Sequence, residues 1–216
     1  MCANDYNAMT TQLGERNVRI IGILGGVASG KSVVAGRLRE LGAEILDADV
    51  VAHEVLREEE VQAAVRQRFG EEVMDDNGVN RSALARIVFA NRDSGSEALG
   101  DLEAIMHPRI GQRLQEQISE IQSQGDAKAL VLDAAVMMKA GWHKLCDVLL
   151  FVDVAPEVRV QRSLARGWSD KEVASREARQ TPVDQKRAVA DVIIDNSGEL
   201  YDTFAQVDRF WQEQMA

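Results

Sequence analysis

The 216-residue chain has few cysteines and no long apolar run, and each absence limits what it can be. Its only cysteines are Cys2 and Cys146, so a disulfide framework is not expected and a reducing compartment fits. No stretch approaches the roughly 20 consecutive apolar residues of a membrane-spanning helix, and residues 1–17 lack the basic start and apolar stretch of a signal peptide. We therefore expect a soluble, cytoplasmic protein with no membrane partner.

Basic residues are outnumbered by acidic ones, with 25 Lys and Arg against 35 Asp and Glu, which gives a net charge of −10. Nucleic-acid binding needs clustered Lys and Arg, so we expect no nucleic-acid partner and predict that any anionic ligand is met by a local pocket. A hydrophobic content of 45% is ordinary for a folded domain. Residues 1–17 are predicted to be a polar, disordered tail. The sequence leaves the oligomeric state open.

Short apolar segments alternate with patterns of helical spacing along the rest of the chain. Strands are predicted at 18–24, 44–46, 129–132, 148–152 and 192–194, each short and aliphatic. Helical spacing fills 59–124 without a clear strand, which is more than a single crossover needs. The predicted fold is α/β: a doubly wound, five-stranded parallel sheet of the P-loop NTPase type, with an inserted helical region.

A phosphate-binding loop is predicted between the first strand and the helix after it. The segment matches G-x-x-x-x-G-K-[ST] without a mismatch and consists of Gly25, Gly26, Val27, Ala28, Ser29, Gly30, Lys31 and Ser32, with Val33 next. Such a loop points N–H groups at phosphate oxygens, Lys31 would reach the β- and γ-phosphates, and the Ser32 hydroxyl would ligate Mg²⁺. The alternative is a glycine-rich turn with a solvated lysine, but a chance match is on the order of one in a hundred.

Three further segments accompany the loop: Leu46-Asp47-Ala48-Asp49, then His107-Pro108, then residues 191–198, which read DVIIDNSG. In this order and spacing the four blocks resemble the dephospho-CoA kinase family, from Val18 to the end of the chain. The resemblance implies that ATP, with Mg²⁺, phosphorylates the ribose 3′-hydroxyl of dephospho-CoA, giving CoA and ADP. That reaction is the final step of coenzyme A synthesis.

The resemblance also implies a three-part layout. The nucleotide core is expected at about 18–58, 126–153 and 181–216, a helical CoA-binding region at about 59–125 and a lid at about 154–180. The chain departs from the family pattern at three places. Leu24 stands where Thr is usual, Ala135 to Lys139 where a Pro-Leu-Leu-x-Glu-like stretch is usual, and Arg166-Gly167 where an Arg-Asp pair is usual. We expect changed affinity and rate rather than a changed reaction, and assign Lys139 no role.

Acidic residues follow two of the predicted strands. Asp49 matches the second Asp of the family's Asp-Ala-Asp and is expected to orient or deprotonate the attacking hydroxyl. Its alternative role is to cap a helix starting at Val50, and Asp47 has a cap or an outer-shell Mg²⁺ role as equal possibilities. Asp133 ends the third strand, where a carboxylate could hold Mg²⁺ or merely end the strand.

Two arginines of the predicted lid are candidates for contacting ATP. Arg162 and Arg166 are four residues apart on a helix that Pro156 is predicted to begin, so they share one face. Arg166 matches the lid arginine of the family. A guanidinium suits phosphate oxygens, although surface arginines are usually solvated.

His107, Asn196 and Gly198 complete the candidates. The resemblance gives His107 a contact with the acceptor, while His107-Pro108 could instead be a helix entry. Asn196 and Gly198 follow the last strand, where the adenine is expected.

Two other functions compete with the one implied by the resemblance. A different P-loop kinase, for a nucleoside, nucleotide or sugar acid, would share the core and lid. A regulatory GTP-binding switch would need an Asn-Lys-x-Asp guanine motif, which the sequence lacks.

Overall fold

A computed structural model describes residues 18–89 and 97–215 of the chain. The predicted tail at 1–17 lies outside the described residues. The described residues form two compact units: one contains the residues up to Leu46 and from Gln115 onward, and the other is Asp47–Leu114.

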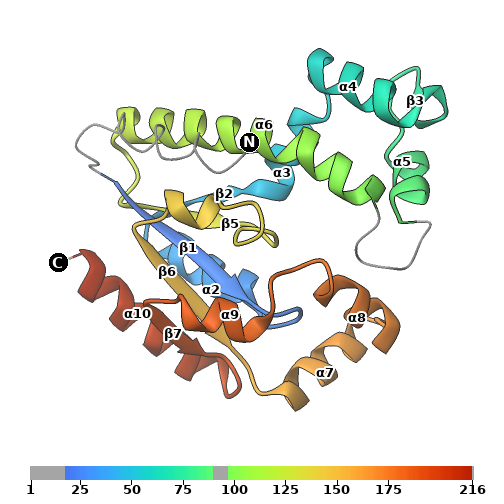
Figure 1. Cartoon of the computed structure of the whole chain (residues 1–216). Helices are drawn as coiled ribbons and strands as arrows, with labels where there is room; N and C mark the ends of the chain where they lie inside the picture. The colour runs from blue at the N-terminus through green and yellow to red at the C-terminus, as the bar shows by residue number, and fades with distance from the viewer. Residues whose placement is uncertain (1–17, 90–96, 216) are drawn as a thin grey trace. The chain divides into compact units, whose positions relative to one another are not determined.

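The first unit is built on a five-stranded sheet in the order β2-β5-β1-β6-β7 (Figure 1). β1 is central and pairs in parallel with β5 on one side and β6 on the other, and β6 pairs in parallel with β7. The predicted five-stranded parallel sheet is confirmed. The strands are β1 Arg19–Gly25, β2 Ala43–Asp47, β5 Ala129–Asp133, β6 Val148–Asp153 and β7 Val192–Asp195.

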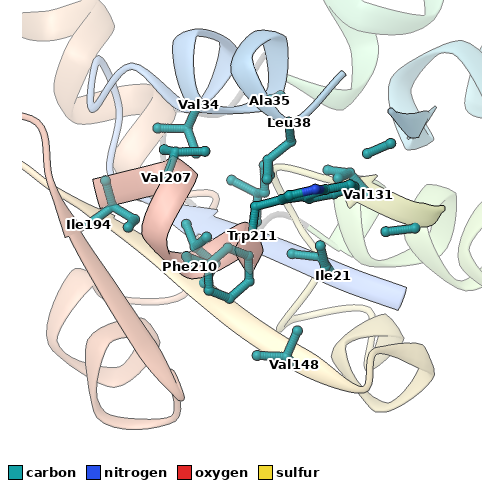
Figure 2. Close-up of a cluster of buried hydrophobic side chains, with 14 of the residues drawn as sticks. Ile21, Val34, Ala35, Leu38, Val131, Val148, Ile194, Val207, Phe210 and Trp211 are labelled. Carbon is teal, nitrogen blue, oxygen red and sulfur yellow. The ribbon is translucent and has the colours of Figure 1, made fainter. Parts of the chain in front are cut away.

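One face of the sheet is covered by α2 (Lys31–Glu40) and α10 (Leu200–Met215). Figure 2 shows Val34 and Leu38 of α2 and Phe210 of α10 packed with strand residues in one buried cluster. The intervening strand residues are buried on the opposite face, including Ile20 of β1. Burial on both faces explains why the strands are continuous apolar runs rather than alternating ones.

On this opposite face, neighbouring side chains approach β1 closely at Gly22. A Cβ there would lie 2.7 Å from the Cys146 Sγ and 2.8 Å from a methyl of Leu149, closer than real side chains approach. Glycine at this position therefore lets the segment that contains η3 (Trp142–Leu145) pack tightly on the central strand.

The second unit contains α3 (Ala48–Val55), α4 (Glu59–Phe69), η2 (Glu71–Val73), α5 (Arg81–Val88) and the first part of α6 (Glu97–Gln124). Inside it, the Glu58 carboxylate pairs with Arg109 and Arg113. The expectation that no strand interrupts this region is wrong. A two-stranded hairpin, β3 (Met74–Asp75) and β4 (Gly78–Val79), follows η2. Its two-residue turn is Asp76-Asn77, and Gly78, with φ 104°, follows as the first residue of β4. Asp, Asn and Gly in succession are a local turn signal that the helical interpretation overlooked.

Pro108 does not begin a helix, so the helix-entry alternative for His107-Pro108 is wrong. Pro108 lies inside α6, which starts at Glu97. A proline has no N–H to donate to the carbonyl four residues back, so this helix lacks one backbone bond. Met106, Ile110 and Leu114 are buried at helical spacing around it, and we attribute the continuity of the helix to that packing.

Three short helices complete the first unit: α7 (Pro156–Ala165), α8 (Asp170–Glu177) and α9 (Val183–Ala188). α8 begins with a capping box, in which Ser169 and Glu172 exchange hydrogen bonds. No helix within the described ranges is long and apolar enough to cross a membrane.

The shared core of α2, α10 and the sheet predicts a large cost for Phe210→Ala. Phe210 is 2% exposed, so truncation should lower the free energy of unfolding by about 3–5 kcal/mol. Tyr201→Ala, on the same helix at 80% exposure, should change it by less than about 0.5 kcal/mol. Urea unfolding of both variants measures the difference, and equal losses would contradict this packing.

Candidate active site

The phosphate loop joins the central strand to the first helix of the sheet. β1 ends at Gly25 and α2 begins at Lys31, with a turn closed by the Ser29 N–H donating to the Gly26 carbonyl at 3.2 Å. Ala28 has φ 60°, the only positive value at a non-glycine position among the described residues. The loop therefore holds a backbone shape that L-residues rarely adopt.

The start of α2 has no side chain to cap it. Its N-cap is Gly30, with φ 86°, and the first turn consists of Lys31, Ser32 and Val33, none of them acidic. The first N–H groups of a helix have no partners within the helix and carry a partial positive charge. The turn is thus open to an anionic ligand, with the Lys31 and Ser32 side chains beside it.

Two glycines of the loop are required by close contacts. A Cβ on Gly25 would lie 2.5 Å from the Ser29 Oγ, and one on Gly30 would lie 2.3 Å from the Asn196 Nδ2. The Ser29 hydroxyl is itself buried, and no described residue hydrogen-bonds to it. The loop is therefore packed tightly against the rest of its unit.

The Ser29 carbonyl of the loop accepts hydrogen bonds from residues in the last third of the chain. The Ser29 carbonyl accepts from the Asn196 Nδ2 at 2.8 Å and from the Arg162 Nη1 at 3.3 Å. Arg162 also donates to the Asn196 carbonyl at 2.8 Å. The Asn196 Oδ1 accepts from the buried Thr203 hydroxyl at 3.0 Å. Asn196 thus binds the loop with its side chain, whereas Gly198 lies exposed before α10.

Lys186 of α9 holds the other end of the loop, and sequence reasoning missed it. Its Nζ donates to the Gly25 carbonyl at 3.1 Å and to the Gln180 Oε1 at 2.6 Å. Burial, with the nearby charges of Lys31 and Arg159, lowers the pKa of Lys186 to about 8. Nothing in the sequence distinguishes this lysine from the exposed ones, because its burial depends on how α9 folds back to β1.

Arg159 of α7 is a second missed residue. Its guanidinium lies against Gly26, since a Cβ added to that glycine would be 3.0 Å from the Arg159 Nη1. The same guanidinium pairs with Glu177 of α8. A cavity of about 270 Å³ lies between α7 and α8, lined by residues that include Val27, Arg159, Trp168 and Glu177. The predicted lid segment thus already contacts the loop through α7.

Arg166 lies one residue beyond the last residue of α7, the helix that carries Arg162. Gly167 has φ 73°, its N–H donates to the Leu164 carbonyl, and the Trp168 N–H donates to the Ser163 carbonyl. This is a Schellman turn, and it makes Arg166 the C-cap of α7. The Arg166 guanidinium lies 5.3 Å from the centre of the Trp168 ring. The Arg-Gly pair, a departure from the family pattern, is therefore a helix stop.

The carboxyl end of β5 lies beside the loop. Asp133 is half-buried and stands opposite Ile23, two residues before the loop begins. Leu24 and Ala135, two of the departures, line a small hollow together with Lys31 and Lys186. Lys139, the charge-reversing departure, is exposed.

Asp47, Asp49 and His107 belong to the unit Asp47–Leu114 and are described within it. The carboxylate of Asp47 accepts from the Asp49 N–H at 2.8 Å and from the Val50 N–H at 3.4 Å. Asp47 is thus the N-cap of α3, and the alternative that Asp49 caps this helix is wrong, because the helix begins two residues earlier than expected. Asp49 is exposed in the first turn, and His107 lies half-buried on α6.

A parallel sheet whose central strand ends in such a loop, with lysine and arginine side chains gathered on it, is the fold and site of a P-loop kinase. The family model described as dephospho-CoA kinase matches residues 19–202, which is most of the chain. The chain belongs to the dephospho-CoA kinase family.

Relatives and a solved structure agree with this assignment. The chain is 39% identical to a dephospho-CoA kinase of Symbiobacterium thermophilum over 90% of its own length and 81% of the relative's. It is 37% identical to that of Thermobifida fusca, over 89% of this chain and 94% of the relative. The crystal structure of TT1252 from Thermus thermophilus superposes with a TM-score of 0.76 at 32% identity, covering 93% of this chain and 99% of that one.

The bonds around Asn196 predict that Asn196→Asp weakens nucleotide binding. An aspartate would place an acceptor oxygen against the Ser29 carbonyl, so the loop would lose a donor and gain a repulsion. We expect the Kd for ATP to rise roughly tenfold, equivalent to about 1.4 kcal/mol. Asp202→Asn, at the exposed start of α10, is the matched control. Calorimetric titration with ATP measures both, and an unchanged Kd in Asn196→Asp would refute this role.

Proposed function

We propose that the protein transfers the γ-phosphate of ATP to the ribose 3′-hydroxyl of dephospho-CoA, giving CoA and ADP. The observation that carries the proposal is the family match through residues 19–202, which spans every candidate site residue. The phosphate loop supports the same chemistry, since its open N–H groups suit a polyphosphate. The cytoplasm is the proposed place of this reaction.

The loop residues from Gly25 to Val33 would bind the phosphates of ATP. Backbone N–H groups cradle the chain of phosphates, and Lys31 neutralises the charge that develops on the transferred group. Arg162, already hydrogen-bonded to the loop, is positioned to add a guanidinium there. For Arg166 to contact the phosphates as well, its guanidinium would have to move away from the Trp168 ring. We therefore propose that the segment 154–180 closes over ATP as a lid.

Asp49 is the proposed residue that orients the attacking hydroxyl and receives its proton. Asp47 already caps α3, so the carboxylate of Asp49 is not required for that purpose. His107 is proposed to contact the acceptor from the helical region at about 59–125, which would bind the CoA moiety. The remaining segments, 18–58, 126–153 and 181–216, form the proposed nucleotide core.

Magnesium is the proposed metal, bound together with ATP. No cluster of three or more His, Cys, Asp or Glu side chains that could hold a metal occurs among the described residues. That fits Mg²⁺, which typically takes few protein ligands and is otherwise held by substrate phosphates and water. Ser32 in the first turn of α2 and Asp133 beside Ile23 are the hydroxyl and carboxylate that suit it. Bound there, the ion would offset phosphate charge.

Release of ADP measured with and without dephospho-CoA tests the proposed reaction. We expect strong stimulation by dephospho-CoA and none by nucleosides, shikimate or gluconate. Lys31→Ala should abolish the stimulated rate without lowering the unfolding midpoint, because Lys31 belongs to the phosphate site rather than the core. Stimulation by another acceptor instead would assign the chain to a different kinase reaction.

Asp49→Asn separates proton transfer from binding. Asparagine keeps the size of the side chain but is a poor proton acceptor, so kcat should fall roughly 10²–10⁴-fold. The Kd for ATP and the unfolding midpoint should not change, because the cap of α3 is Asp47. Asp47→Asn, which can still cap, is the control and should retain most activity. Wild-type kcat in Asp49→Asn would remove the proposed role.

A further inference from the structure

Lys186 is almost completely buried, at 3% exposure of the residue. An ammonium has three N–H donors, and the two acceptors it meets, the Gly25 carbonyl and the Gln180 side chain, are both neutral. Burying a cation without a bonded carboxylate is costly. A neutral donor could also satisfy the Gly25 carbonyl, so the charge itself points to a role beyond folding.

The neighbours of Lys186 make the site more positive. Lys31 of α2 and Arg159 of α7 both disfavour its charge, and only Glu177 of α8 opposes them. That glutamate is already paired with Arg159. On α9 itself, Asp184 and Arg187 are the other charged residues, and Arg187 pairs with Asp153 of β6. Among the described residues that shift the pKa of Lys186, the cations therefore outnumber the anions.

We propose that Lys186 is a positioning residue of the phosphate site: its ammonium holds the Gly25 carbonyl and the end of the lid segment at Gln180, and its charge strengthens the binding of the ATP polyphosphate. This inference rests on the proposed function only in taking ATP as the ligand. The bond to Gly25 fixes the residue from which the loop departs, so the loop N–H groups stay directed to the ligand. The bond to Gln180 ties the loop to the segment that follows α8.

The charge of Lys186 should make ATP binding depend on pH. With the pKa near 8, the free enzyme holds a partly neutral amine at pH 8, and an incoming polyanion favours the protonated form. ATP binding therefore takes up a proton, and affinity falls as pH rises through this value. If only the protonated form binds, the Kd rises about tenfold from pH 7 to pH 9. ATP itself changes little in this range, because phosphate has its second pKa near about 6.

Calorimetric titration of wild-type protein with Mg²⁺ and ATP at pH 8, in two buffers of different ionisation enthalpy, tests this directly. We expect uptake of about half a proton and the rise in Kd between pH 7 and 9. Lys186→Met should bind ATP more weakly, with no proton uptake and a flat pH profile. Lys186→Arg should restore part of the affinity with a flat profile, because arginine stays charged. Lys171→Met, an exposed lysine of α8, should behave as wild type.

No proton uptake by the wild type, or the same uptake in Lys186→Met, would overturn the proposal, whatever the variants do to the unfolding midpoint. Because no acceptor is present, the titration is independent of the reaction. ATP binding with the predicted uptake but no ADP release on adding dephospho-CoA would refute the proposed function and leave the role of Lys186 standing.

Discussion

The structure depends on how the carbonyl groups of the phosphate loop are satisfied. A loop that turns its N–H groups toward a ligand must turn its carbonyls elsewhere, and buried carbonyls need donors. Lys186 supplies one for Gly25, and Asn196 and Arg162 supply two for Ser29. All three donors come from the part of the chain after β6. The loop near the N-terminus therefore takes its shape only when the last third of the chain has folded on it.

The same donors link the fold to the chemistry. The protein as a whole is acidic, with a net charge of −10, yet Lys31, Arg159, Arg162 and Lys186 gather where phosphate is expected. Clustered cations repel one another in the free protein and attract a polyanionic ligand, so binding of that ligand relieves the repulsion. The Arg159–Glu177 pair on α7 and α8 moderates this charge and belongs to the segment proposed as the lid.

Local patterns in the sequence predicted the strands and the phosphate loop, because each depends on neighbouring residues. Other local signals were present but misread. The segment from Asp76 to Gly78 marked the hairpin, and Arg166-Gly167 marked the end of α7. Pro108 suggested a helix start that tertiary packing overrides. Lys186 could not have been found in this way. Its partner Gly25 lies 161 residues away, and burial of a lysine leaves no mark on its own segment.

Phosphorus NMR of the products tests most directly whether this loop serves transfer to an acceptor. The wild-type protein is incubated with ATP, Mg²⁺ and dephospho-CoA, and the new phosphate resonance is assigned by its coupling to the ribose protons. We predict a phosphomonoester on the 3′-hydroxyl, formed in equal amount to ADP. Inorganic phosphate as the main product, or a phosphoester on any other position, would contradict this conclusion.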